Sequence, residues 1–186
     1  KRRLSDRIKI EYAEGYSKDT LTILKSGKSV IEKATEASSL SDISIVVLGE
    51  DESTDGENRD RASLNLPKQQ EDLIHALYKT GKPIVVVLLN GRPLKIDWIA
   101  RHIPAIVEGW YSGDSSGMAI ADVLLGNINP AGKLPITFPR SVGQLPYYYD
   151  HKPSSWHLYV DEKNTPLFPF GFGLIYTTFQ YSKLEV

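Results

Sequence analysis

The stretch from Gly49 to Pro67 concentrates groups that can exchange protons or bind ligands. Six carboxylates and two cations lie in it, namely Glu50, Asp51, Glu52, Asp55, Glu57 and Asp60 with Arg59 and Arg61. An apolar run ends directly before this loop, so the charges follow a strand that is expected to be buried. Whether the loop serves catalysis, ligand binding or solvation decides whether the chain is an enzyme, part of an enzyme or a binding module.

Two further loops place polar and aromatic side chains after expected strands. Asn90 to Pro93 follows the second apolar run, and Trp110 and Tyr111 follow a third. Functional groups of an open parallel sheet gather beyond the carboxyl ends of its strands, so the three loops are expected to meet if their strands are neighbours. Charged groups beside aromatic faces would suit a polyol, although Trp110 and Tyr111 could equally cap the core.

Two ion-binding interpretations of the acidic loop are disfavoured by its own residues. Asp51, Ser53, Asp55 and Gly56 match the opening spacing of a calcium-binding EF-hand loop, but Ala62 stands where the bidentate carboxylate is required. A phosphate site is also disfavoured, because phosphate needs backbone donors and positive charge and these carboxylates repel anions. No metal site and no cofactor are therefore expected.

A loop that is acidic only because it is solvated is the simplest alternative. Against it stands the tight alternation of cations and carboxylates around Glu57, which solvation alone does not require. The histidines match no catalytic motif and are expected to be structural or at the surface; they are His75, His102, His151 and His157.

The elements that position these loops follow from periodicity. The apolar runs 43–48 and 84–89 are nearly continuous and predict strands buried on both faces of a parallel sheet. Shorter candidate strands are 8–12, 105–107 and 135–138, and helical spacing occurs over 29–40, 67–80 and 117–125. The alternation predicts an α/β three-layer sandwich with a mainly parallel sheet of about five strands flanked by helices. The C-terminal third is rich in Pro, Gly and aromatic residues and predicts long ordered loops.

Composition narrows the classes of partner. The 186 residues include 22 Lys and Arg against 23 Asp and Glu, so neither nucleic acid nor a membrane surface is indicated. The absence of cysteine excludes disulfides and thiolate chemistry and leaves the compartment open. No apolar run approaches the roughly 20 residues that a membrane-spanning helix needs.

The chain resembles the C-terminal α/β sandwich domain of glycoside hydrolase family 3, of the bacterial β-glucosidase type. The motifs that carry the resemblance are the pairs Gly49-Glu50, Gly56-Glu57 and Asp60-Arg61 and the segments 81–88, 90–93, 121–126, 129–139, 144–146 and 166–174. The chain departs from the family at 113–117, which lacks the usual Glu-Gly-Gly, and at Ile175, where Ser is usual. The resemblance implies a sandwich over 1–176 without the family's first strand and helix, followed by a linker or the start of another domain over 177–186.

The resemblance also implies a function for a longer parent protein. Such enzymes hydrolyse terminal β-D-glucosyl residues of β-glucosides or short β-glucans with retention, and their nucleophilic Asp belongs to a preceding barrel domain. The residue matching their general acid/base is Glu57, with Glu50 and Glu52 as alternatives, and Arg59, Arg61, Trp110 and Tyr111 are candidate sugar-side or interface residues. Nearby arginines favour the charged form of such a carboxyl group, whereas Asp55, Asp60 and desolvation favour the protonated form. A periplasmic or secreted location is implied; the rival class is a non-catalytic carbohydrate-binding or domain-bracing module.

Overall fold

The computed structural model describes residues 8–17, 27–150, 152 and 158–183 of the chain. These residues fall into two compact units, Lys1–Tyr111 and Ser112–Val186. The first unit contains the sheet and all three loops singled out above, so it positions the candidate site. The expected histidine roles at His151 and His157 lie outside the described residues.

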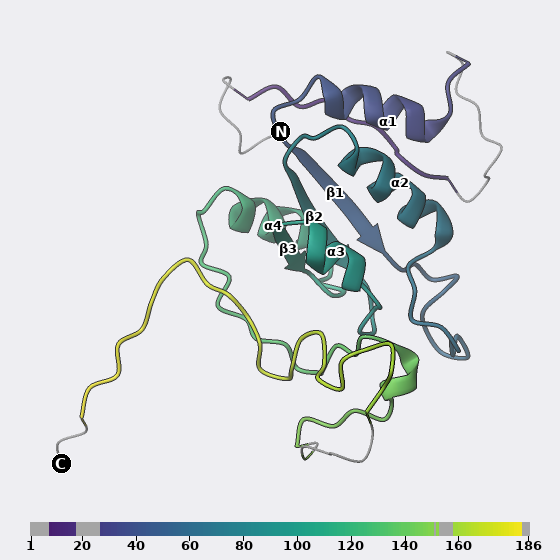
Figure 1. Ribbon diagram of the computed structural model, residues 1–186. Coiled ribbons are helices and arrows are strands. Elements are labelled where there is room, and N and C mark those ends of the chain that lie inside the picture. The colour runs from purple at the N-terminus through teal and green to yellow at the C-terminus, as the bar shows by residue number, and fades with distance from the viewer. Residues whose placement is uncertain (1–7, 18–26, 151, 153–157, 184–186) are drawn as a thin grey trace. The chain divides into compact units, whose positions relative to one another are not determined.

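A parallel three-stranded sheet forms the centre of the first unit (Figure 1). Its strands are β1 (Ser44–Gly49), β2 (Ile84–Leu89) and β3 (Ala105–Glu108), in the order β1-β2-β3. The register pairs Val46 with Val86 and Val86 with Ile106. Because the strands are parallel neighbours, their carboxyl ends and the loops that follow them lie along one edge of the sheet.

The central strand β2 is more deeply buried than its neighbour β1. Val86, Val87 and Leu88 of β2 are fully enclosed, as a continuous β-branched run predicts. In β1 the burial alternates, and Ile45 and Val47 remain 53% and 50% exposed. The expectation that both apolar runs are buried on both faces is therefore correct for β2 and wrong for β1, which lies at the edge of the observed sheet.

Three helices accompany the sheet in the first unit: α1 (Val30–Ser39), α2 (Lys68–Tyr78) and α3 (Asp97–His102). α1 begins at a capping box, in which Ser29 and Glu32 satisfy each other's backbone N–H groups. α1 and α2 lie side by side in Figure 1, and α2 buries Leu73, Ile74 and Leu77. The parallel strands are joined through α2 and α3, the βαβ connection that such sheets require.

The second unit contains α4 (Ser116–Leu124), a short 3₁₀ helix η1 (Val142–Gln144) and long loops, as its composition predicts. Phe138 is buried and pairs with Phe168 through an isolated antiparallel bridge, with the ring centroids 6.2 Å apart. Gln144 joins distant loops, because its Nε2 donates to the carbonyl oxygen of Lys163 at 2.9 Å while its Oε1 accepts from the Arg140 N–H at 2.6 Å.

The α/β sandwich class is confirmed, but its strands are fewer than expected. Within the described ranges the sheet has three strands where about five were predicted. Residues 8–12 form no strand, and 135–138 contributes only the Phe138 bridge. None of the helices seen in those ranges combines the length and apolarity needed to cross a bilayer.

Candidate active site

The three loops that follow β1, β2 and β3 meet in one polar network. Arg92, from the loop after β2, forms ion pairs with Glu50 and Asp55 of the loop after β1. Tyr111, beyond the end of β3, makes a side-chain hydrogen bond with Asp55. The prediction that these loops lie near one another is confirmed, because their strands are adjacent in the sheet.

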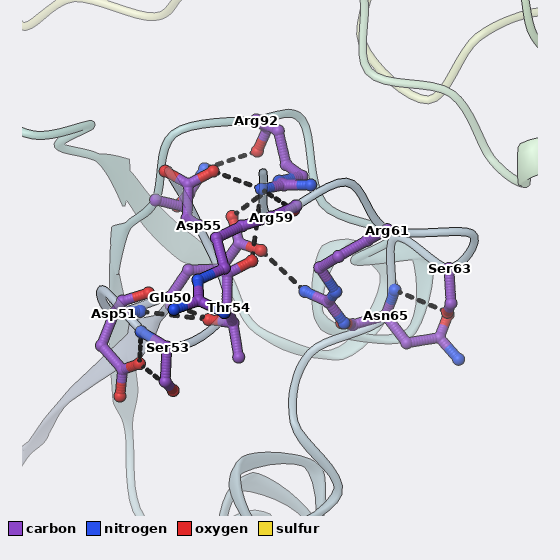
Figure 2. Close-up of polar contacts among 12 residues, drawn as sticks. Glu50, Asp51, Ser53, Thr54, Asp55, Arg59, Arg61, Ser63, Asn65 and Arg92 are labelled. Atoms are coloured by element: carbon purple, nitrogen blue, oxygen red, sulfur yellow. Dashed lines mark hydrogen bonds and ion pairs between the residues drawn. The ribbon is translucent and has the colours of Figure 1, made fainter. Parts of the chain in front are cut away.

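Glu50 forms the buried centre of the network (Figure 2). Its side chain is 0% exposed, and its Oε1 lies 2.7 Å from Nη1 of Arg61. Its Oε2 lies 3.3 Å from Nε of Arg92. A buried carboxylate needs such partners, because leaving one unpaired costs several kcal/mol. The second guanidinium nitrogen of Arg61 donates to the Asn65 carbonyl oxygen at 2.7 Å, which ties the end of the loop to the same centre.

Asp55 is the second carboxylate that the network holds. Its Oδ1 accepts a short hydrogen bond from Nη2 of Arg92. Burial raises the pKa of Asp55, but the hydrogen bonds from Arg92 and Tyr111 and the charge of Arg92 outweigh it, so the pKa lies below its usual value. For Tyr111, burial and then the hydrogen bond to Asp55 raise the pKa to about 12, so the hydroxyl stays protonated and donates.

Two glycines allow the loops to approach this closely. A Cβ on Gly91 would lie 2.1 Å from Oδ2 of Asp55 and 2.9 Å from Cε2 of Tyr111. At the end of β1, Gly49 has φ +144°, and a Cβ there would lie 1.8 Å from the carbonyl oxygen of Leu89. Side chains at either position would push the acidic loop away from the sheet edge.

Glu57 stands on a tight turn beyond this network. The turn runs from Gly56 to Arg59 and is closed by the Arg59 N–H donating to the Gly56 carbonyl oxygen at 3.1 Å. Asn58 has φ +60°, the left-handed conformation that Asn tolerates at the third position of such a turn. Glu57 is exposed, and no described residue forms a hydrogen bond or an ion pair with its carboxyl group. The ion pairs thus enclose Glu50 and Asp55 and leave Glu57 facing solvent.

The other predicted site residues come from the acidic loop and from the chain that follows β3. Arg59 has an exposed side chain, and its carbonyl oxygen accepts a hydrogen bond from Arg92 at 3.2 Å. Arg61 is drawn into the pair with Glu50. Trp110 adopts a left-handed backbone conformation with φ +49°. The structure brings Arg61 and Tyr111 into the network, and contact of any of these residues with a sugar stays a prediction.

Sequence reasoning placed Asn90 in a candidate loop but did not single out Glu108, the last residue of β3, whose side chain is hydrogen-bonded to Asn90. Asn90 is 0% exposed and donates from Nδ2 to the Arg92 carbonyl oxygen at 2.9 Å. Glu108 Oε1 accepts the Trp110 N–H at 3.1 Å. Burial raises the pKa of Glu108 to about 7, against smaller lowering by hydrogen bonds from Trp110 and Asn90. The signal in the sequence was a carboxylate directly ending an apolar strand.

The remaining polar groups offer no metal centre among the residues that the structure describes. No three His, Cys, Asp or Glu side chains there are arranged to hold an ion. Asp51, first in the calcium-like spacing, instead accepts hydrogen bonds from the N–H and hydroxyl of Ser53 at 2.8 and 2.5 Å. His75 and His102 both pack against Trp98, edge-on and stacked, with ring centroids 4.2 and 4.4 Å away, as expected of structural side chains.

The chain is similar in sequence and in structure to known glycoside hydrolases. Residues 3–176 match the family model described as "Glycosyl hydrolase family 3 C-terminal domain". Over 97% of its length the chain is 45% identical to a β-xylosidase of Formosa agariphila, and over 98% it is 42% identical to a periplasmic β-glucosidase of Salmonella typhimurium. It spans 25% of the length of each. A solved β-glucosidase from Listeria innocua, in complex with glucose, is similar with a TM-score of 0.76 and 35% identity over 81% of this chain and 23% of that one.

Proposed function

The chain belongs to glycosyl hydrolase family 3 as its C-terminal domain, and we propose that it supplies the general acid/base of a retaining β-glucosidase whose nucleophile lies on another domain. Glu57 is the acid/base in this proposal. The proposed substrates carry terminal β-D-glucosyl residues. Because one of the two relatives above is named a β-xylosidase and the other a β-glucosidase, β-xylosides are the alternative substrate class. The periplasmic relative supports a periplasmic or secreted location.

The observation that carries the proposal is the contrast between Glu57 and Glu50, the main alternative for the same role. A general acid must reach the leaving oxygen of a substrate held by another domain, so its carboxyl group must be accessible. Glu50 is fully enclosed between Arg61 and Arg92, whereas Glu57 is exposed at the corner of a defined turn. Glu50 therefore suits an anchoring role and Glu57 a role in proton transfer.

The reaction places Glu57 in two successive steps. The nucleophilic carboxylate attacks the anomeric carbon while Glu57 gives its proton to the departing glycosidic oxygen. Glu57, now a carboxylate, then takes a proton from the water that hydrolyses the glycosyl-enzyme intermediate. Two carboxyl groups about 5–5.5 Å apart are needed for this geometry. Docking of the nucleophile domain would remove water around the turn, which favours the protonated carboxyl group that the first step requires.

The candidate sugar-side residues are kept as part of the proposal. Arg59 is the most accessible cation beside the turn, and Trp110 and Tyr111 follow β3. Arg61 would act on the sugar side only through the loop that it anchors to Glu50. The sandwich boundary at residue 176 and the linker over 177–186 are likewise proposed.

A leaving-group series in the full-length parent protein tests the assignment. Glu57→Gln should reduce kcat/KM by about 10²- to 10⁴-fold on an alkyl β-glucoside, whose leaving group needs a proton, and far less on a dinitrophenyl β-glucoside. Glu52→Gln, an exposed carboxylate of the same loop, is the matched control and should keep the wild-type dependence. If Glu57→Gln behaves like wild type while a change at Glu50 or Glu52 shows the pattern, Glu57 is not the acid.

A further inference from the structure

Arg92 contacts both ends of the turn that carries Glu57. Its Nη2 lies 3.2 Å from the Thr54 carbonyl oxygen, before the turn, and 3.2 Å from the Arg59 carbonyl oxygen, at the end of the turn. The same nitrogen bonds the Asp55 carboxylate (Figure 2). One guanidinium group from the loop after β2 therefore holds both stems of the turn, which are Thr54 and Asp55 before it and Arg59 at its end. These residues are 33 to 38 positions away from Arg92 in the sequence.

Arg92 is itself fixed by groups at the sheet edge. Its Nε faces Oε2 of Glu50 at 3.3 Å, and the Glu50 side chain is fully buried. The Arg92 carbonyl oxygen accepts the hydrogen bond from the enclosed Asn90. A planar guanidinium held in this way presents its donors in fixed directions, which the single ammonium of a lysine cannot reproduce.

Asp55 is held from a second side. Tyr111, beyond β3, bonds the Asp55 carboxylate, and Gly91 leaves the space into which that carboxylate fits. Asp55 precedes Glu57 by two residues, so the position of its carboxylate sets where the turn begins. The ends of β2 and β3 thus act on the same stem of the turn.

The turn would be adaptable without these contacts. Gly56 has φ +132° and Asn58 φ +60°, conformations typical of residues with few steric limits. Exposed loops with such residues tend to move, yet a displacement of about 1 Å at a reacting group can cost about 10²-fold in rate.

We propose that Arg92, assisted by Asp55 and Tyr111, is the positioning group that orients the Glu57 turn toward the leaving oxygen. This inference rests on the proposed function of Glu57. Arg92 touches no reacting atom in this account and acts through the stems of the turn.

The test uses the full-length parent with Arg92→Lys, and with Arg101→Lys as a matched control. Arg101 has an exposed side chain and pairs with Asp97 of the same helix, α3. In Arg92→Lys, amide hydrogen exchange over 50–62 should accelerate while exchange in β1 and β2 stays unchanged. The value of kcat/KM on an alkyl β-glucoside should fall by about 10²-fold, and kcat/KM on a dinitrophenyl β-glucoside by less than about 3-fold. A merely structural loss would lower both rates in proportion.

The outcomes separate this inference from the proposed function. If Glu57→Gln shows the leaving-group effect but folded Arg92→Lys does not, the positioning role is wrong and the function of Glu57 stands. If Glu57→Gln itself shows no such effect, both the proposed function of Glu57 and the positioning role of Arg92 are wrong. Should Arg92→Lys fail to fold, Asp55→Asn and Tyr111→Phe replace it, with the same selective loss expected at about 3- to 10-fold, because each removes one contact. Equal losses on both substrates in these two variants would overturn the inference.

Discussion

The carboxyl group of Glu50 lies 2.7 Å from Nη1 of Arg61 and is wholly shielded from solvent. Arg92 approaches the other carboxyl oxygen at 3.3 Å. One buried carboxylate thus joins the first and last parts of the acidic loop to the loop after β2. Negative charge directly after β1 thus builds a support, and under the proposed function the group that serves chemistry, Glu57, stands a few residues further on.

Removing the charge of Glu50 tests the support. Glu50→Gln should destabilise the domain by about 3 kcal/mol, because two partly buried guanidinium groups lose their counter-charge. The free energy of urea unfolding measures this. Asp72→Asn breaks the exposed pair with Lys68 on α2 and should cost less than about 1 kcal/mol. Equal costs for the two variants would contradict a structural role for Glu50.

The space beside Gly91 gives a second prediction. Gly91→Ala puts a methyl group where Oδ2 of Asp55 now lies, so Asp55 must leave its contacts with Arg92 and Tyr111. We expect a loss of stability of about 1–3 kcal/mol together with reduced turnover of alkyl β-glucosides by the full-length parent. Gly117→Ala is the control, since outside its chain neighbours and its own helix backbone nothing lies within 4 Å of the added Cβ, and alanine favours the helix α4. A Gly91→Ala variant as stable and active as Gly117→Ala would show that the approach of the loops is not required.

The raised pKa of Glu108 predicts how the stability of the domain changes with pH. Its pKa is raised to about 7 in the folded protein from an ordinary value of 4.5. Between these values the unfolded chain loses the proton while the folded chain keeps it, so stability falls as the pH rises from 4.5 to 7. The shift corresponds to at most about 3 kcal/mol. Below this window and above it, the contribution of Glu108 is constant.

The variant Glu108→Gln isolates that contribution. A glutamine keeps an oxygen acceptor for the Trp110 N–H and cannot ionise, so it imitates the protonated acid. Urea unfolding at pH 4 and pH 8 should give nearly equal stability for both proteins at the lower pH and a more stable variant at the higher. A parallel pH dependence in the two proteins would mean that Glu108 does not hold its proton.

The 186-residue chain should be unable to hydrolyse an aryl β-glucoside by itself. Under the proposed function this chain supplies one carboxyl group of the required pair, and the nucleophile would belong to another domain. Circular dichroism would establish that the purified chain is folded, and release of the aryl alcohol would measure turnover. Turnover by this chain at a rate near that of the parent would contradict the division of labour.

The sequence predicted the meeting of the three loops, because strand identity and parallel order determine which loops share an edge. Periodicity also located α1, α2 and α4. α3 was missed, since six residues including Trp98 carry no capping signal. The different environments of Glu50 and Glu57 could not be predicted, because they depend on contacts of Arg92 with residues far away in the sequence, among them Glu50, Thr54 and Arg59. The burial of Asn90 and Glu108 likewise depends on packing, and local pattern does not encode it.

Chemical rescue of Glu57→Ala in the full-length parent tests the central claim most directly. With a dinitrophenyl β-glucoside the first step needs no proton, so the glycosyl-enzyme should form and then wait for a nucleophile that requires no base. Added azide should restore turnover and give the β-glucosyl azide, identified by nuclear magnetic resonance. Unchanged activity without azide, or an α-glucosyl azide as product, would contradict the assignment of Glu57 as the acid/base of a retaining enzyme.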